Sequence, residues 1–423
     1  MGAARVQRPQ RQQVQWRPWA LEQLLPSDHR VRVVWRFVES LNLTPLYAGI
    51  RAVEGGTGRD AVDPRLLLAL WLWATIEGVG SARQLARLCE RDLPYLWMCG
   101  DVTVNYHLLS DFRTGHAELL ERLLTDSVAT LMHQGLVTLE GVAQDGMRVR
   151  ASAGSSSFRR RKTLEKCQRV AREHLAQLRS EGQSEASASE DRRQAAQARA
   201  AREREQRIEQ ALAELQELEA QKEQREKGSA QKARASTTDP EARLMKMGDG
   251  GFRPAYNVQL VTDTEARVIV AVAVTNQGSD RGELAPMHAT LEQRYGKRPA
   301  KYLVDCGFGT KEDITCVEAR GTAVYTPVYG EHAIRGRGND PFAPRRGDTP
   351  EIIRYRKRMG TAAGQAIYRQ RCSVAEFPNA EFRNRGLSQF RVRGRLKVKA
   401  VALWHALAFN LLRMVHLQCL PCR

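Results

Sequence analysis

The sequence predicts an α/β protein that combines an α-helical N-terminal domain, a core built on a β-sheet, and a helical hairpin inserted into that core. Apolar residues recur at helical spacing as far as Gly135, and strand-like alternation begins directly after it. A densely charged stretch then interrupts the strand pattern. We therefore expect residues 1–135 to form the helical domain, residues 136–157 and 236–423 to form the core, and residues 158–235 to form the insertion.

The first 135 residues contain several expected helices. Pro26-Ser27-Asp28 is a typical helix start, and the apolar positions from Val31 to Leu41 share one face. The run LLLALWLWATI follows Pro64, which suits the first turn of a helix because its missing N–H would have no partner there. This longest apolar run in the chain is too short to span a bilayer, so we expect a buried helix and no membrane.

Strands are expected on both sides of the insertion. The stretch LVTLEGVAQDGMRVRAS alternates as a strand does around Asp145. After the insertion, residues 256–263 and 267–275 are typical of a hairpin, and a helix then precedes a short buried strand that ends at Asp305. If the strands of Asp145 and Asp305 are neighbours, as short right-handed connections favour, the two carboxylates can converge on one point.

The insertion is strongly charged. Residues 158–234 hold 19 Lys or Arg and 14 Asp or Glu among many Ala, Gln and Leu residues. Apolar residues spaced by three or four positions run from Leu164 to Leu178 and again from Ile208 to Leu215, with the Ser-rich break SEGQSEASASED between them. This pattern predicts an antiparallel helical hairpin that projects from the core, with a disordered charged segment as the alternative.

The charge balance indicates a polyanionic partner. The chain carries 66 Lys and Arg against 48 Asp and Glu, a formal net charge of +18. From Glu351 to Arg423 there are 15 Lys or Arg and only 3 Glu, and this stretch ends in a long expected helix, GRLKVKAVALWHALAFNLLRMVHL. Mixed signs serve solubility better than such an excess, so the tail predicts a nucleic-acid-binding surface.

The sequence favours a cytoplasmic protein. The stretch MGAARVQRPQRQQVQW lacks the apolar centre of a signal peptide. The eight cysteines show no disulfide framework, which suits a reducing compartment. Cys419 and Cys422 form a CxxC pair without a second pair, which is only a weak indication of zinc.

Three acidic residues are candidates for a shared site: Asp145, Asp305 and Glu376, the last in YRQRCSVAEFPNAEFRNRG. Three oxygen ligands without a His or Cys cluster suit Mg²⁺ or Mn²⁺ better than Zn²⁺. Two such ions can assist phosphodiester chemistry. Each acid also has a plain structural alternative. Asp145 precedes a glycine as in a turn, Asp305 can cap the next helix or turn, and Glu381 competes with Glu376.

Other carboxylates fit ordinary structural roles. Asp263, Asp280 and Asp313 are each expected to be a turn or cap residue.

Three blocks of the sequence resemble bacterial insertion-sequence transposases of the DDE class, whose catalytic core is ribonuclease-H-like. VAQDGMRVRASAGSSSFRR is similar to the strand with the family's first Asp and maps it to Asp145. KYLVDCGFGTKED is similar to the second and maps it to Asp305, with Cys306 where Ala is commoner. LLPSDHRVRVVWRFVE and VNYHLLSDFRTGH resemble the helical domain that precedes this core.

The third block, YRQRCSVAEFPNAEFRNRG, resembles the family's Tyr-Arg-Glu-Lys signature. Tyr368, Arg371 and Glu376 match it, and Arg383 stands where the family often has Lys. Ala375 departs from the usual Val before the Glu, which removes no ligand.

The resemblance implies a ribonuclease-H-like mixed sheet and a DNA transposase. Asp145, Asp305 and Glu376 would be catalytic and would hold Mg²⁺ or Mn²⁺, with two ions expected. The enzyme would hydrolyse phosphodiesters at the ends of its element and join the freed 3′-OH ends to target DNA. Four residues are expected to contact DNA: Tyr368, Arg371, Arg383 and Arg148.

The expected partner is double-stranded DNA, both the terminal inverted repeats of the element and the target. Because two ends must be paired, we expect a homodimer on DNA, acting at the bacterial nucleoid in the cytoplasm. The alternatives are a catalytically inactive DNA-binding relic and a nuclease of the same fold.

Overall fold

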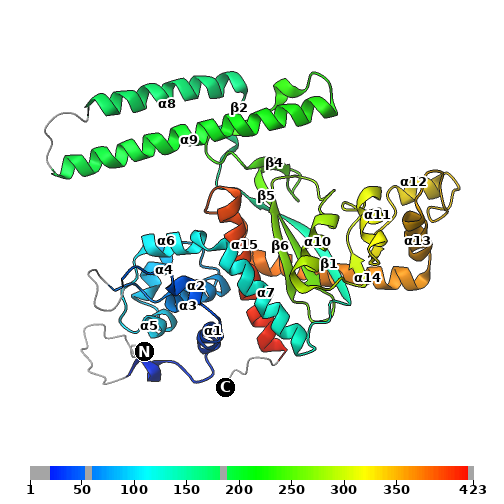
Figure 1. The fold of residues 1–423 in the computed structure, drawn as a ribbon, viewed down its shortest axis with the longest axis horizontal. Helices are drawn as coiled ribbons and strands as arrows, with labels where there is room; N and C mark the ends of the chain where they lie inside the picture. The colour runs from blue at the N-terminus through cyan, green and yellow to red at the C-terminus, as the bar shows by residue number, and fades with distance from the viewer. Residues whose placement is uncertain (1–19, 53–59, 182–187, 418–423) are drawn as a thin grey trace, which may run out of the picture.

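The computed structural model describes residues 20–52, 60–181 and 188–417. A group of N-terminal helices lies beside a sheet-containing core, and two long helices lie over the end of the core that carries β4 (Figure 1). The N-terminal stretch MGAARVQRPQRQQVQW and the Cys419–Cys422 pair lie outside the described residues, and the six described cysteines are free.

The N-terminal region is helical, as expected from its apolar spacing. Its α3 begins at Pro64, and the Asp63 carboxylate before it accepts a hydrogen bond from the Arg65 amide at 2.8 Å. The expected start at Pro26-Ser27-Asp28 is displaced, because α1 begins at Arg30 and is capped by the His29 ring. The elements are η1 (Leu21–Leu24), α1 (Arg30–Glu39), α2 (Thr44–Tyr47), α3 (Pro64–Ile76), α4 (Ala82–Cys89), α5 (Leu93–Cys99), α6 (Tyr106–Gly115) and α7 (Ala117–His133).

The core is a mixed sheet with strand order β4-β5-β1-β7-β8, and β6 also pairs with β5. β1 runs antiparallel to β5 and parallel to β7, so the strands that lead to Asp145 and Asp305 are neighbours, as expected. The hairpin after the insertion is β5 with β6. The strands are β1 (Gly141–Arg150), β4 (Arg243–Lys246), β5 (Phe252–Asp263), β6 (Ile269–Thr275), β7 (Lys301–Leu303) and β8 (Ala323–Tyr325).

Helices cover the sheet. α14 packs against β1 and β5, while α7, α10 and α15 pack against β6. The Asn410 side chain of α15 bonds both the amide and the carbonyl of Ile269, each at 2.8 Å, and so completes the edge of β6. These helices and the others that follow β6 are α10 (Leu284–Tyr295), α11 (Lys311–Ala319), α12 (Glu331–Gly336), α13 (Pro350–Met359), α14 (Ala362–Asn384) and α15 (Arg395–His416).

α15 is the one described helix long and apolar enough to cross a membrane by length and composition, and 78 % of its most apolar window is buried inside the molecule. Its indole at Trp404 donates to the Arg113 carbonyl of α6 at 2.9 Å. The helix therefore packs as the central core helix that joins the N-terminal helices to the sheet.

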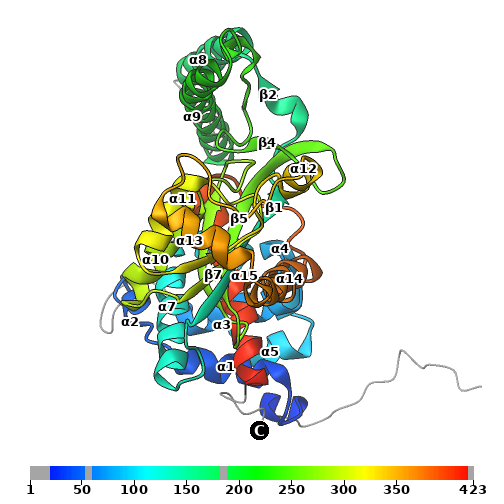
Figure 2. The same cartoon turned by 90° about the vertical axis from the view of Figure 1, so that its right-hand side faces the viewer.

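The charged insertion forms a hairpin, as expected. Its helices α8 (Arg161–Glu181) and α9 (Ala188–Arg225) lie side by side over the core (Figures 1 and 2). It joins the core through a two-stranded antiparallel ladder of β2 (Phe158–Arg159) and β3 (Ala235–Ser236), flanked by the short turns η2 (Ser155–Ser157) and η3 (Ala230–Lys232). Leu164 and Leu215 are buried in a small core of its own.

Candidate active site

Asp145 lies in the middle of β1 with its side chain directed at α14. Its Oδ1 accepts a hydrogen bond from Arg371 Nη2 at 2.9 Å, and its Oδ2 accepts one from Asn379 Nδ2 at 2.8 Å. The carboxylate is 16 % exposed. The Asp-Gly pair is therefore part of a strand and not a hairpin turn, because β1 continues through it in regular register with β5.

Asp305 lies two residues beyond β7, beside Asp145, which lies two residues beyond the last pair of β1 with β7, Ala143 and Leu303. The Gly307 amide donates to its Oδ1 at 2.7 Å, and the Thr326 hydroxyl donates to its main-chain carbonyl at 2.9 Å. A Cβ atom at position 307 would lie 2.9 Å from that same Oδ1. Glycine is thus needed at 307 for the tight turn that holds the carboxylate in place.

Glu376 extends from α14 toward the same place. Its Oε1 lies 3.8 Å from Arg371 Nη1, and the side chain is 62 % exposed. The competing Glu381 is turned away and pairs with Arg385 at 2.8 Å. Pro378 interrupts the hydrogen-bond ladder of the helix just after Glu376.

A single guanidinium therefore links the three acids. Arg371 Nη2 is 2.9 Å from Asp145 Oδ1 and 3.9 Å from Asp305 Oδ2, and Nη1 faces Glu376. Arg371 is 8 % exposed, and its Nε has no hydrogen-bond partner. Three negative charges surround one positive charge, so the site is left with an excess of acid.

For Asp145 and for Arg371, burial and the neighbouring opposite charges shift the pKa in opposite directions. Burial raises the pKa of Asp145 to about 6, Asp305 and Asp280 add to the rise by repulsion, and Arg371 opposes it. Burial also lowers the pKa of Arg371, but Asp145, Asp305 and Tyr368 together raise it above its ordinary value. The arginine is thus held charged between its acidic neighbours.

The oxygen atoms of these side chains suit a hard cation, but the side chains are too far apart in this structure to bind one together. Among the residues that the structure describes, no group of three His, Cys, Asp or Glu side chains is close enough to hold an ion. The arginine lies between the acids instead. Asn379 supplies a further oxygen, because its Oδ1 is buried beside Asp145 without any hydrogen-bond partner. Carboxylate and amide oxygens are the ligands that Mg²⁺ and Mn²⁺ prefer.

The residues expected to contact DNA differ in their burial and in their distance from the acid site. Tyr368 is half-buried one helical turn before Arg371, and burial raises the pKa of its phenol. Arg383 is exposed at the last turn of α14, with no carboxylate partner among the described residues.

Arg148 faces away from Asp145. Strand residues alternate between faces, so Arg148 and Gly146 share the side of the sheet opposite to Asp145. The Arg148 guanidinium donates to the carbonyls of Lys246 at 3.2 Å and Gly278 at 3.0 Å. It therefore lies outside the acid site, although it remains 34 % exposed.

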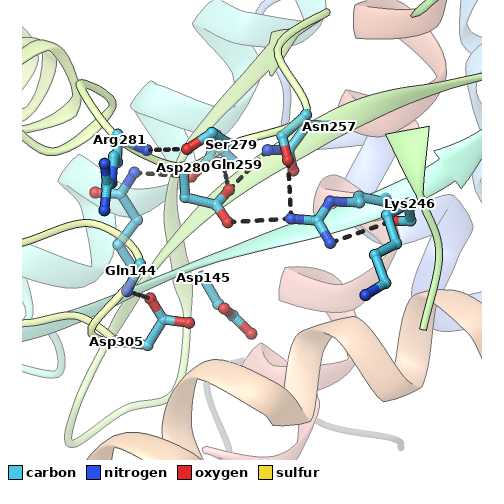
Figure 3. Close-up of polar contacts among 12 residues, drawn as sticks. Gln144, Asp145, Lys246, Asn257, Gln259, Ser279, Asp280, Arg281 and Asp305 are labelled. Atoms are coloured by element: carbon cyan, nitrogen blue, oxygen red, sulfur yellow. Dashed lines mark hydrogen bonds and ion pairs between the residues drawn. The ribbon is translucent and has the colours of Figure 1, made fainter. Parts of the chain in front are cut away.

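Asp280 was expected to be a turn or cap residue, and it begins a turn, since its main-chain carbonyl accepts a hydrogen bond from the Glu283 amide at 3.2 Å. Its side chain has a further role that the sequence did not predict. Its Oδ1 accepts hydrogen bonds from Asn257 Nδ2 and Gln259 Nε2, each at 2.7 Å (Figure 3). Its Oδ2 lies 3.8 Å from Arg148, so the network is on the Arg148 side of the sheet. Gly146 leaves the necessary room, since a Cβ there would lie 2.1 Å from Asp280 Oδ1. The signal in the sequence is the pair Asn257 and Gln259, two amides on one face of a buried strand.

The expected turn or cap roles of Asp263 and Asp313 are confirmed. Asp263 accepts from the amides of Leu139, Glu265 and Ala266. Asp313 Oδ2 accepts from the Gly282 amide and the Thr310 hydroxyl. Asn379 was not singled out from the sequence, although it stands three residues after Glu376 in the third block.

Two family models match the chain. A transposase domain (DUF772) matches residues 19–115, and a transposase DDE domain matches residues 217–411, which includes Asp305, Arg371 and Glu376 and begins after Asp145. No curated protein and no solved structure gives a significant match. Proteins of this class act on DNA and depend on divalent metal ions. The chain thus belongs to the insertion-sequence DDE transposases, with a mixed sheet consistent with a ribonuclease-H-like core, and it is a DNA transposase.

Proposed function

We propose that Asp145, Asp305 and Glu376 are the catalytic acids of this transposase. In this proposal the enzyme hydrolyses phosphodiesters at the ends of its element and joins the freed 3′-OH ends to target DNA. The supporting observation is that these three carboxylates, from β1, the turn after β7 and α14, face one guanidinium at 2.9, 3.9 and 3.8 Å. Asp145 and Arg371, which are 226 positions apart in the chain, meet at that point only because the fold brings them together.

The three carboxylates would hold Mg²⁺ or Mn²⁺, two ions in our proposal, which supply activation of the attacking oxygen and stabilisation of the leaving oxygen. Asp145 and Asp305 are held by fixed hydrogen bonds, whereas Glu376 is largely exposed and can adjust as DNA arrives. Asn379 keeps Asp145 oriented through its Nδ2, and its free Oδ1 faces the same space.

Arg371 keeps the acid site intact in the absence of DNA. Its charge offsets the repulsion among the acids and keeps Asp145 directed at α14. A DNA phosphate offers the same guanidinium a second anionic partner, so Arg371 can also position the backbone near the acids. Tyr368 and Arg383 would contact the neighbouring phosphates, and Arg148 would contact DNA only from the opposite side of the sheet.

The chain would act as a homodimer on DNA, because two ends of the element must be paired, and its place of action would be the bacterial nucleoid. No feature of the described residues favours an inactive copy, since all three acids are present and directed at the same arginine.

The test uses a plasmid that carries the gene of this chain with its flanking DNA. Purified wild type with Mg²⁺ or Mn²⁺ is expected to cut the plasmid and give joined products. Asp145→Asn and Glu376→Gln should each lower the cutting rate about 100-fold or more while DNA binding is kept. Glu381→Gln, a matched change in the same helix, should leave the rate unchanged.

Three outcomes would contradict the proposal. If the Asp145→Asn variant cuts DNA as fast as wild type, Asp145 is not a catalytic residue. Wild type that binds DNA but never cuts it indicates an inactive relic. Cut ends that are never joined indicate a nuclease of the same fold.

A further inference from the structure

A basic groove lies where the helical hairpin meets the core. A cavity of about 940 Å³ is lined by the end of α9, the segments that join the hairpin to the core, β4, and the loop 276–279 after β6. Seven of its lining side chains are Lys or Arg and three are Glu. It is distinct from the acid site, since neither the three acids nor Arg371 line it.

The groove holds more positive charge than its acids balance. Arg243 pairs with Glu214, Arg395 lies 3.8 Å from Glu241, and Lys232 lies 3.7 Å from Glu226. Four other lining cations have no carboxylate partner among the described residues: Arg160, Lys222, Arg225 and Arg234. Glu217 is the lining acid without a paired cation, so the unpaired charge is strongly positive.

Two of these cations follow the ladder at the base of the hairpin. The ladder ends with the pair of Arg159 and Ala235, and Arg160 and Arg234 are the next residues on its two segments, where both line the groove. Like charges gathered in one groove repel each other. Lys222 and Arg225 stand three residues apart on α9 and thus share one helix face beside them. An anionic partner would relieve this repulsion.

The groove is connected to the catalytic sheet. Gly278 lines the groove, and its carbonyl accepts a hydrogen bond from Arg148 at 3.0 Å. Arg148 is three residues along β1 from Asp145, roughly 10 Å at the rise of a strand, and its side chain lies on the opposite face of the sheet. DNA held at the acid site would therefore reach this basic surface by passing around the end of the sheet beyond Arg148.

We infer that the base of the hairpin is a second DNA-binding site, in which the phosphate backbone of one strand of a DNA duplex lies in the groove. The inference rests on the proposed function, because it takes as ligand the same DNA that the acid site would cut. It gives the charged insertion a role: α9 presents Lys222 and Arg225 to DNA beyond the cut, and the core supplies the opposite wall.

The test compares two double variants of the full chain on the same helix. Lys222→Gln with Arg225→Gln removes two groove cations, whereas Arg202→Gln with Arg204→Gln removes two exposed cations of α9 outside the groove. Binding of a duplex of about 40 base pairs of arbitrary sequence is measured as a function of salt. The groove variant should lose roughly 10- to 100-fold in affinity near 0.1 M salt, with a salt slope smaller by about two.

The control variant should bind as wild type does, with an unchanged slope. Arg160→Gln with Arg234→Gln, on different segments, should repeat the loss and guards against a folding defect confined to α9. Equal binding by wild type, groove variants and control would overturn the inference and leave the proposed function standing. A change of oligomeric state without a change in DNA binding would assign the hairpin to self-association and also overturn it. Wild type that binds no DNA would instead refute the proposed function itself.

Discussion

Strand β1 carries Asp145 on one face of the sheet and Arg148 on the other, and the two faces differ in how completely their charges are balanced. On the Asp145 side, three carboxylates share the one guanidinium of Arg371. On the Arg148 side, the single carboxylate of Asp280 is held by two amides at 2.7 Å and lies 3.8 Å from Arg148. Each side also holds two buried polar atoms without partners, Arg371 Nε and Asn379 Oδ1 on the first and Arg148 Nε and Asn257 Oδ1 on the second, so the faces differ in their net charge. The first face has an excess of acid, and the second is a scaffold.

This difference follows from what each face must do. Unpaired buried charge costs stability and persists where binding depends on it. A polar network whose members pair with one another makes the sheet rigid at the same depth. The acid site would thus be completed by cations and DNA, whereas the Asp280 network already holds the strands in place.

The largest expected effect is the difference in stability between variants of Arg371 and Arg148. Arg371→Met leaves three acids without a counter-charge, and we expect it to lower the free energy of unfolding by about 3–5 kcal/mol without metal. Mg²⁺ should restore part of this loss, because a cation can replace the missing charge. Arg148→Met loses two hydrogen bonds to main-chain carbonyls, which should cost about 1–3 kcal/mol with no effect of Mg²⁺.

Urea unfolding of both variants, with Mg²⁺ and with a chelator, measures these differences. If both variants lose the same free energy of unfolding and respond equally to Mg²⁺, the two faces do not differ in the way described.

The pH dependence of stability should reveal the buried carboxylate. The pKa of Asp145 is about 6 in the folded protein against an ordinary 3.8, so folding favours its protonated form. The stability from this group is complete below about pH 4 and is lost as the pH rises through 6. Asp145→Asn mimics the protonated form, so without metal its advantage over wild type should grow to about 3 kcal/mol above pH 7.

Unfolding free energies of wild type and Asp145→Asn between pH 4 and 8, in chelator, check this expectation. A difference that stays constant across that range would show that Asp145 titrates normally.

The smallest expected effects come from adding one methyl group at Gly146 or at Gly307, one on each face of the sheet. Gly146→Ala places a Cβ 2.1 Å from Asp280 Oδ1 and 2.7 Å from Gln259 Nε2, so the scaffold network must shift, at a cost of about 1–3 kcal/mol. Gly307→Ala brings a Cβ to 2.9 Å from Asp305 Oδ1, which should displace that carboxylate with less effect on stability.

Thermal unfolding and metal titration together distinguish the two. We expect the larger loss of stability in Gly146→Ala and the larger loss of metal affinity in Gly307→Ala. The reverse order would contradict the assignment of scaffold and site to the two faces.

Much of the fold follows from local sequence patterns. The helix after Pro64, the charged hairpin and the β5–β6 hairpin all have the expected type, because periodicity and flanking turn residues determine each of them locally. The neighbouring positions of β1 and β7 follow from the handedness of their connection.

The polar details do not follow from such patterns. Asp280 meets Asn257 and Gln259 only because Gly146 pairs with Gln259 in the sheet, and one sequence does not give that register. Asn379 reaches Asp145 only because α14 crosses β1 at that point. The roles of the three acids, the arginines and the domain limits remain predictions.

The most direct measurement is titration of Mn²⁺ into the full chain, followed by electron paramagnetic resonance. Wild type and Glu381→Gln should bind the ion alike, whereas Asp145→Asn, Asp305→Asn and Glu376→Gln should each weaken binding, and Asn379→Leu should weaken it roughly tenfold. Binding by Asp305→Asn and Glu376→Gln that equals binding by wild type would contradict the claim that these acids form one metal-dependent site.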